Sequence, residues 1–197
     1  MLIIVRHGRT ELNATRRLLG RLNPPLDPLG EAQAAAVADR LRSGSVRRVV
    51  SSPLLRARQT AEAIAAATQS ATEIDDRWIE VDYGVFDGMP LAEVPAEVWA
   101  SWRNDSGFAP PEGESLAAVR TRVTDACEEL LTDVTEHDGD VVVVTHVSPI
   151  KAAVCWTLGV DDGVSWRTFV SPGSITRVGA GPGGPVLHTF NESSLSA

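Results

Sequence analysis

The chain has 197 residues, of which 43% are hydrophobic and 22% are charged, and its formal net charge is −8. These are ordinary values for a globular protein large enough to bury a sizeable core, so wholesale disorder is excluded. The acidic balance argues against a nucleic-acid partner or a membrane partner, because both require a basic footprint on the protein. At this length we expect one domain over residues 1–197.

The predicted elements alternate between strands and helices along the chain. In chain order, the patterns predict a strand at 2–5, a helix from about 31 to 42, a strand at 46–50, a helix ending near 67, a long helix opened by Ser115, a strand at 141–144, a helix at about 148–158, and weaker strands at 175–178 and 186–190. Asp27-Pro28 and Ser52-Pro53 carry the signature of a helix cap followed by proline. This order predicts an α/β fold, a three-layer sandwich in which helices cover both faces of a mostly parallel sheet.

Positively and negatively charged side chains are distributed unequally along the chain. Residues 1–60 carry eleven arginines and a net charge of +7, whereas residues 61–197 carry −15. A basic stretch in an acidic protein indicates either an anion site or a set of surface arginines. Lys151 is the one lysine among the 18 cationic side chains. The planar guanidinium of arginine suits phosphate and carboxylate, so the bias is compatible with oxyanion binding and equally with genome composition.

The lack of a recognisable targeting segment and the small number of cysteines both predict a reducing compartment. The apolar run Leu2–Val5 is too short for a signal peptide, and no run approaches the ~20 residues that span a bilayer. Cys127 and Cys155 are too few for a disulfide framework, and both fall on apolar helical faces. We therefore expect a cytoplasmic protein with two buried, reduced thiols.

One segment, residues 84–114, has no strong periodicity. It contains glycine, proline and acidic residues together with Trp99 and Trp102. Loops of this length are usually functional, so we expect a small lid or binding insertion, with Trp99 on the wall of a substrate pocket. The alternative is a loop that only covers a hydrophobic patch.

Two histidines follow directly after the two clearest strands, His7 after Leu2–Val5 and His146 after residues 141–144. Ligands of parallel α/β sheets bind beyond the carboxyl ends of the strands. Arg6 and Gly8 flank His7, and glycine permits close approach of a ligand. Arg56 falls in the first turn of a predicted helix, where the helix N-terminus favours an anion.

These side chains suit phosphoryl transfer through a phosphohistidine. A neutral imidazole nitrogen is a competent nucleophile near pH 7. Two guanidinium groups and a second histidine would neutralise the charge on the equatorial phosphoryl oxygens. The constellation still lacks an acid for the leaving oxygen.

Longer motifs surround these residues. Arg6–Asn13 reads RHGRTELN, Ser51–Ala61 reads SSPLLRARQTA, Glu80–Gly88 reads EVDYGVFDG, Gly113–Ser115 reads GES and Val143–His146 reads VVTH. In this order they resemble the signatures of the histidine phosphatase (phosphoglycerate mutase-like) superfamily, from residue 2 to about residue 158. The resemblance implies the phosphoglycerate mutase-like fold and no cofactor.

The resemblance also implies a role for each matching residue. His7 would be the nucleophile that becomes phosphorylated. Glu80 would protonate the leaving oxygen and then activate the water that hydrolyses the phosphohistidine. The phosphoryl oxygens would be bound by three side chains, Arg6, Arg56 and His146, with help from Asn13.

Departures from the family pattern concern specificity. His146 is followed by Val147–Ile150, where much of the family has a Gly-Gly pair, and Ser148 could supply a hydroxyl there. Val147–Lys151 is most similar to the α-ribazole phosphatase and broad-specificity acid phosphatase branch. Asp82 stands where several branches have histidine, and it could assist Glu80 or deter highly charged substrates.

The resemblance together with the charge pattern favours a metal-independent histidine acid phosphatase. Its substrate would be a small phosphomonoester such as α-ribazole phosphate or a phosphosugar. No cluster has metal-ligand spacing, so no metal is expected. Residues 84–114 contain Arg103 against six acidic residues, and a mutase needs more positive charge to retain its bisphosphorylated intermediate. A cofactor-dependent phosphoglycerate mutase and a non-catalytic phosphate-binding module are the alternatives. The oligomeric state stays open, and a homodimer is one candidate.

Overall fold

A six-stranded sheet forms the centre of the computed structural model, which describes residues 1–193. The strands lie in the order β3-β2-β4-β1-β5-β6. Four neighbours, β3, β2, β4 and β1, are parallel, and the hairpin of β5 and β6 adds two antiparallel strands. Their bounds are β1 Leu2–Arg6, β2 Val46–Ser51, β3 Ala71–Ile74, β4 Asp140–Thr145, β5 Ser174–Gly181 and β6 Gly184–Ser193.

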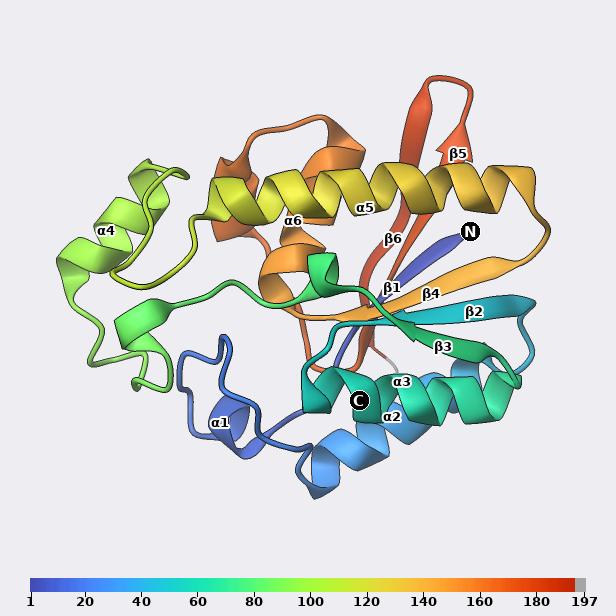
Figure 1. The fold of residues 1–197 in the computed structure, drawn as a ribbon, viewed down its shortest axis with the longest axis horizontal. Coiled ribbons are helices and arrows are strands. Elements are labelled where there is room, and N and C mark those ends of the chain that lie inside the picture. The colour runs from blue at the N-terminus through green and yellow to red at the C-terminus, as the bar shows by residue number, and fades with distance from the viewer. Residues whose placement is uncertain (194–197) are drawn as a thin grey trace.

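Helices cover both faces of the sheet (Figure 1). On one face lie α2 (Pro28–Leu41) and α3 (Leu55–Thr68), and on the other lie α5 (Leu116–Glu136) and α6 (Val147–Leu158). Successive residues of a strand point to opposite faces, so Ile3 and Val5 pack under α2 and α3, whereas Leu2 and Ile4 pack under α5 and α6. The predicted three-layer α/β fold with a mostly parallel sheet is confirmed.

Several local predictions are confirmed and one is wrong. Asp27 caps α2 by accepting from the amide of Gly30 at 2.8 Å, and Ser115 caps α5. Cys127 and Cys155 are both buried and free. The cap predicted at Ser52 is wrong, because α3 begins at Leu55 after Leu54, and no side chain caps it.

The strand β3 escaped prediction for a physical reason. All four of its residues are exposed, so their hydropathy carries neither alternation nor an apolar run. Its register is supplied by the neighbouring strand β2, which pairs with it from Arg48 to Ser51.

Four short helices lie in the connections between these elements: α1 (Glu11–Ala14), η1 (Asp76–Trp78), η2 (Gly84–Phe86) and η3 (Asp162–Arg167).

The segment 84–114 contains η2 and α4 (Ala96–Asn104) and lies at one end of the sheet (Figure 1). Its centre is the buried ring of Trp102, which packs against an aromatic cluster of Tyr83, Phe86, Trp99 and Phe108. Backbone hydrogen bonds tie the segment to the loop after α1, including Leu18 N–H to Met89 O at 2.9 Å.

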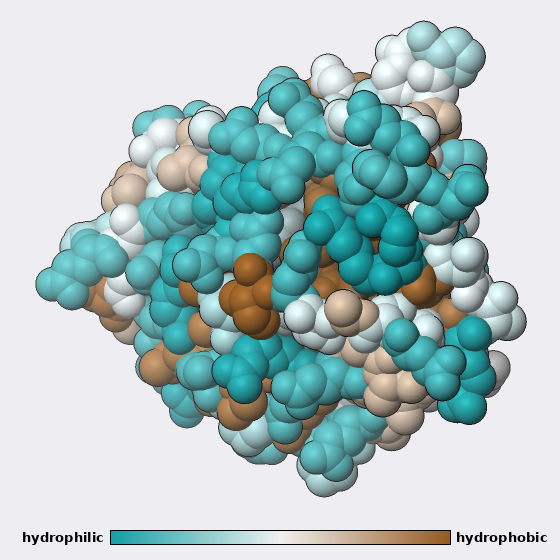
Figure 2. Space-filling model, turned by 45° about the vertical axis from the view of Figure 1, so that its right-hand side comes forward, coloured by the Kyte–Doolittle hydropathy of each residue, from teal (hydrophilic) through white to brown (hydrophobic). Residues whose placement is uncertain are grey.

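Burial of apolar side chains in these clusters leaves a mostly hydrophilic exterior. On the face shown in Figure 2, the hydrophobic residues form small groups separated by hydrophilic ones. Within residues 1–193, no helix is both long enough and apolar enough to cross a membrane.

Candidate active site

The carboxyl ends of β1, β4 and β2 bring the predicted residues together. β1 pairs with β4 so that Arg6 lies opposite Thr145. Each of these two residues is followed by a histidine, His7 and His146. The amide of His7 donates to Thr145 O at 3.0 Å, and the rings of His7 and His146 lie 5.0 Å apart, centre to centre. The parallel register therefore sets the two imidazoles side by side.

The ring of His7 is held so that one nitrogen is left for chemistry. Nδ1 lies 2.6 Å from the carbonyl oxygen of Gly8, which can only accept, so Nδ1 carries the proton. Burial lowers the pKa of His7 well below 6.5, and the charges of Arg56 and Arg6 lower it further. The imidazole is thus neutral at pH 7, with its lone pair on Nε2.

Arg56 contacts that nitrogen directly. It lies in the first turn of α3, as predicted, and its Nε is 3.2 Å from Nε2 of His7. Its two terminal nitrogens donate to backbone oxygens, Nη1 to Leu22 O and Nη2 to Gly20 O, both at 2.8 Å. Burial lowers the pKa of Arg56 to about 10, so the guanidinium stays charged at pH 7.

Two buried polar atoms in the site have no hydrogen-bond partner among residues 1–193, Nε of Arg6 and Nδ1 of His146. Nη1 of Arg6 donates to Val170 O at 2.6 Å, which anchors the side chain. Nε2 of His146 lies 2.7 Å from Oγ of Ser52. We assign the Ser52 proton to this contact, which puts the proton of neutral His146 on Nδ1. Both unpartnered atoms are then N–H donors, the groups that bind an oxyanion.

Glu80 is fixed by three backbone amides, two at the beginning of α6 and one from the next residue in the chain. Oε2 accepts from Val147 N–H at 3.1 Å, and Oε1 accepts from Ser148 N–H at 3.2 Å and from Val81 N–H at 2.8 Å. A carboxylate has about four acceptor positions, so one position, on Oε2, is left for a proton. The side chain is only 3% exposed. This geometry suits a group that gives and takes one proton at one oxygen.

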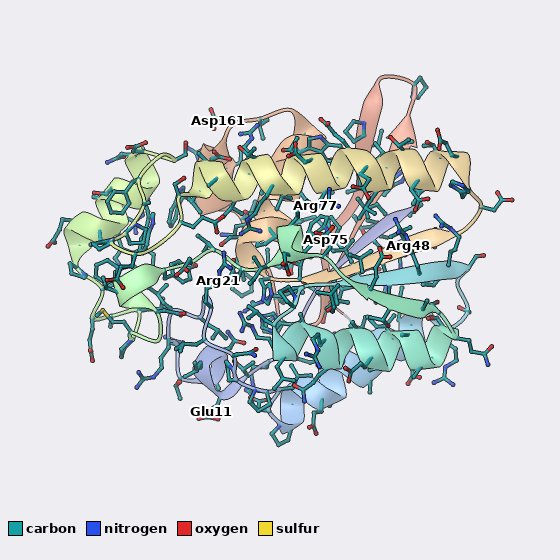
Figure 3. All side chains as sticks on the ribbon, viewed as in Figure 1. Glu11, Arg21, Arg48, Asp75, Arg77 and Asp161 are labelled. Atoms are coloured by element: carbon teal, nitrogen blue, oxygen red, sulfur yellow. The ribbon has the colours of Figure 1, made fainter. Side chains whose placement is uncertain are left out.

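The approach of the chain to Glu80 is fixed by η1. Asp75 caps η1 through the amide of Arg77, and the Arg77 guanidinium pairs with Asp75 at 2.7 Å, below α5 in Figure 3. The carbonyl of Trp78 accepts a 2.5 Å hydrogen bond from Oγ1 of Thr145, the last residue of β4. The acid is therefore positioned against the strand that ends at His146.

A cavity of about 340 Å³ opens over these groups, within the range of small-molecule sites. Its lining includes six of the predicted site residues, namely Arg6, His7, Asn13, Glu80, Trp99 and Ser148. Arg56 and His146 are fully buried beneath it. Oδ1 of Asn13 accepts from the amide of Thr10 at 3.1 Å, which leaves the NH₂ of Asn13 as the group available to an anion.

Other lining residues escaped the sequence analysis. They include Tyr83, Arg17, Lys151 and Trp166. For Lys151 a signal existed, because it follows Ser148 by three residues and so lies on the same face of α6. Burial raises the pKa of Tyr83, so its hydroxyl stays protonated.

Two predictions about individual residues do not hold. Asp82 does not line the cavity, because its carboxylate turns back to accept from the amide of Gly84 at 2.9 Å. Gly8 does not line the cavity, and packing excludes a side chain there, because a Cβ atom would meet the carbonyl oxygen of Gly30 at 2.2 Å. The lack of a side chain at Gly8 lets the loop after β1 pack closely against α2.

The charge argument against a mutase also does not hold. Among the residues described, none of the six acidic side chains of 84–114 lines the cavity. Glu114, for example, pairs with Arg122 and with Arg21, which is in the loop after α1 and is labelled beside this segment in Figure 3. Net charge along a segment differs from the charge that faces a cavity, because loop geometry decides which side chains turn inward.

No metal-binding group emerges from the described part of the chain. Within residues 1–193, no set of three or more His, Cys, Asp or Glu side chains is placed to hold a metal ion.

Comparison with known proteins gives relatives along nearly the whole chain. A sequence profile of the histidine phosphatase superfamily, branch 1, matches residues 2–193. A "bifunctional protein" of Mycobacterium tuberculosis is 37% identical over 179 residues, covering 89% of this chain and 49% of the relative. The chain thus spans about half the length of the first curated relatives it matches.

A second relative and a solved structure match over more of their own length. The glucosyl-3-phosphoglycerate phosphatase of Mycolicibacterium vanbaalenii is 35% identical over 197 residues, covering 92% of this chain and 88% of the relative. A mycobacterial glucosyl-3-phosphoglycerate phosphatase, solved in complex with VO3, has a TM-score of 0.88 and 29% identity, covering 98% of this chain and 99% of that one. With the profile match and the ordered motifs, these likenesses assign the chain: it belongs to the histidine phosphatase superfamily, branch 1.

Proposed function

We propose that this chain hydrolyses phosphomonoesters of small metabolites through a phosphohistidine formed at Nε2 of His7. The observation that carries the proposal is the protonation pattern around His7. Nδ1 is occupied by the Gly8 carbonyl, and the remaining lone pair on Nε2 lies beside the Arg56 guanidinium. The unpartnered Nε of Arg6 and Nδ1 of His146 complete a set of donors for phosphoryl oxygens.

In the first step, Nε2 of His7 attacks phosphorus and the bond from phosphorus to the leaving oxygen breaks. Glu80 supplies the proton that the leaving oxygen takes up, so the alcohol departs neutral. The Arg56 Nε–H, which lies at the long end of hydrogen-bond distance from Nε2, turns to a phosphoryl oxygen as the lone pair is used. The cations then stabilise the charge that is spread over the equatorial oxygens.

In the second step, water attacks the phosphohistidine. The Glu80 carboxylate takes a proton from this water, the bond between nitrogen and phosphorus breaks, and inorganic phosphate leaves. His7 regains its lone pair and Glu80 regains its proton, so the cycle closes without a metal or a cofactor.

The proposal is tested with a panel of monoesters that includes p-nitrophenyl phosphate, phosphosugars, phosphoglycerate derivatives and α-ribazole phosphate. We expect phosphate release from several of them, with kcat/KM of about 10⁴ M⁻¹s⁻¹ or more for the best substrate. Absence of turnover across the whole panel would favour the non-catalytic phosphate-binding module. With 3-phosphoglycerate and 2,3-bisphosphoglycerate, isomerisation faster than phosphate release would favour the mutase.

A further prediction concerns Asp87, which supports the site from outside the cavity. Its carboxylate accepts from three consecutive amides, those of Gly20–Leu22, at 2.7 to 2.8 Å. The carbonyls of Gly20 and Leu22 in turn hold the Arg56 guanidinium. In Asp87→Asn an NH₂ group would face amide donors, so the turn should shift and move Arg56.

We expect kcat/KM of Asp87→Asn to fall by about 10²-fold, the cost of a displacement near 1 Å at a reacting centre. The inhibition constant of vanadate should weaken in parallel, because Arg56 binds the phosphoryl oxygens. Asp105→Asn is the matched control, since Asp105 caps an exposed turn of the same segment by accepting from Gly107 N–H at 2.8 Å. A lower melting temperature without loss of vanadate affinity would contradict the proposed link to Arg56.

A further inference from the structure

Beyond the phosphate-binding groups, two cationic side chains line the cavity, Arg17 and Lys151. Arg17 is exposed and donates through Nη1 to Gly88 O at 2.8 Å, whereas Lys151 is half-buried. Lys151 lies on α6 one turn after Ser148, so both side chains face the cavity. The lining also includes the aromatic rings of Trp99 and Trp166 and the side chain of Leu116, the first residue of α5. A cation thus follows an apolar wall within the same cavity as His7.

The ammonium group of Lys151 is held but not neutralised. Nζ donates to the carbonyl oxygen of Ser165, on η3, at 2.6 Å. No carboxylate in residues 1–193 lies within ion-pair distance of it, whereas Arg21, Arg120 and Arg122 elsewhere on the surface all pair with carboxylates. An ammonium has three N–H donors, so two are left for another acceptor.

Partial burial makes this arrangement costly without an anion. The side chain is half-buried, and burial lowers the pKa of Lys151, while Glu80 counteracts this through space. A partly desolvated cation without a carboxylate partner is stabilised when a ligand supplies the negative charge. A substrate whose non-phosphate end is neutral would leave the charge of Lys151 without a partner.

We propose that Lys151 binds a carboxylate carried by the substrate at the end away from its phosphate. The inference depends on the proposed hydrolase function and narrows its substrate class to phosphorylated carboxylic acids. The phosphoryl group would lie at His7, the carbon body against the tryptophan wall, and the carboxylate at Nζ. This class differs from the α-ribazole phosphate and phosphosugars that the sequence led us to expect, because those compounds carry no carboxylate.

The test compares 3-phosphoglycerate with glycerol 3-phosphate, which has a hydroxymethyl group in place of the carboxylate. Each is measured as a competitive inhibitor of p-nitrophenyl phosphate hydrolysis, so the result does not depend on its own turnover. We expect the wild type to bind 3-phosphoglycerate more tightly, and Lys151→Met to reduce this preference by about 10- to 100-fold, the worth of a charge-assisted hydrogen bond. Lys151→Arg should retain most of the preference.

Arg167→Met is the matched control. Arg167 is an exposed cation on η3, the short helix whose Ser165 carbonyl binds Lys151, and it does not line the cavity. The preference of this variant for 3-phosphoglycerate should equal that of the wild type. An unchanged preference in Lys151→Met, or equal weakening of both compounds, would overturn the inference while leaving the hydrolase intact. If the wild type hydrolyses no monoester of the panel, the proposed function fails, and calorimetric dissociation constants of the two compounds still decide the role of Lys151.

Discussion

The His7→Ala variant should lose p-nitrophenyl phosphate turnover by about 10⁴-fold or more, the scale of losses when a covalent nucleophile is removed. No neighbouring group can replace Nε2 of His7, because the corresponding nitrogen of His146 is engaged with Ser52 at 2.7 Å. Steady-state rates measure the loss. A second readout is the phosphoenzyme itself, which should be stable to alkali and labile to acid, as expected of a bond between nitrogen and phosphorus.

The fold should survive this substitution. The imidazole of His7 makes two hydrogen bonds, to the Gly8 carbonyl and with Arg56 Nε, each worth about 1 kcal/mol, so the variant should melt earlier than the wild type and still fold. His188→Ala is the control, since His188 is exposed on β6 far along the sheet from the site. Equal rates in wild type and His7→Ala, or an acid-stable phosphoenzyme, would exclude the phosphohistidine.

The Glu80→Gln variant should accumulate the phosphoenzyme when p-nitrophenyl phosphate is the substrate. Nitrophenolate leaves without needing a proton, so the first step is nearly preserved, whereas the second step loses the base that activates water. We expect steady-state turnover to fall by about 10²- to 10⁴-fold. A burst of about one equivalent of nitrophenol per enzyme should precede it, and stopped-flow absorbance measures that burst.

An alkyl phosphate such as glycerol 3-phosphate provides the contrast. Its leaving oxygen requires the proton from Glu80, so the first step fails and no burst of alcohol should appear. Glutamine leaves the amide of Val147 without its acceptor, at a cost of about 1–3 kcal/mol of folding free energy, so melting temperatures must accompany the kinetics. A steady-state rate close to that of the wild type with both substrates would remove Glu80 from the mechanism.

Elements that depend on local hydropathy can be predicted from the sequence, whereas elements that depend on pairing with distant segments cannot. The apolar runs at 2–5 and 141–144 predict two buried strands from hydropathy alone, and the structure has strands there at Leu2–Arg6 and Asp140–Thr145. Parallel pairing then required that the residues following them meet at one edge, which located His7 and His146. The exposed strand β3 has no such pattern, and its place depends on pairing with β2.

The direction of side chains in loops could not be predicted from the sequence. Asp82 and Asp87 belong to one motif, yet the first turns to Gly84 and the second reaches across to the loop at Gly20–Leu22. The dipeptide Ser52-Pro53 predicts a helix cap, whereas in the structure the Ser52 side chain contacts His146. These partners are set by where the backbone of each loop runs, which adjacent residues do not encode.

By itself, the sequence determined the layered α/β architecture, the two histidines at the edge of the sheet and, through its ordered motifs, the family and the chemistry to expect. These properties follow from local hydropathy and from motifs that keep their residues in a fixed spacing. Only the tertiary structure decided which charges face the cavity, with Lys151 turned inward and Glu114 paired outside it. The physical reason is that electrostatic recognition depends on distance and burial, and contacts between segments far apart in the chain set both.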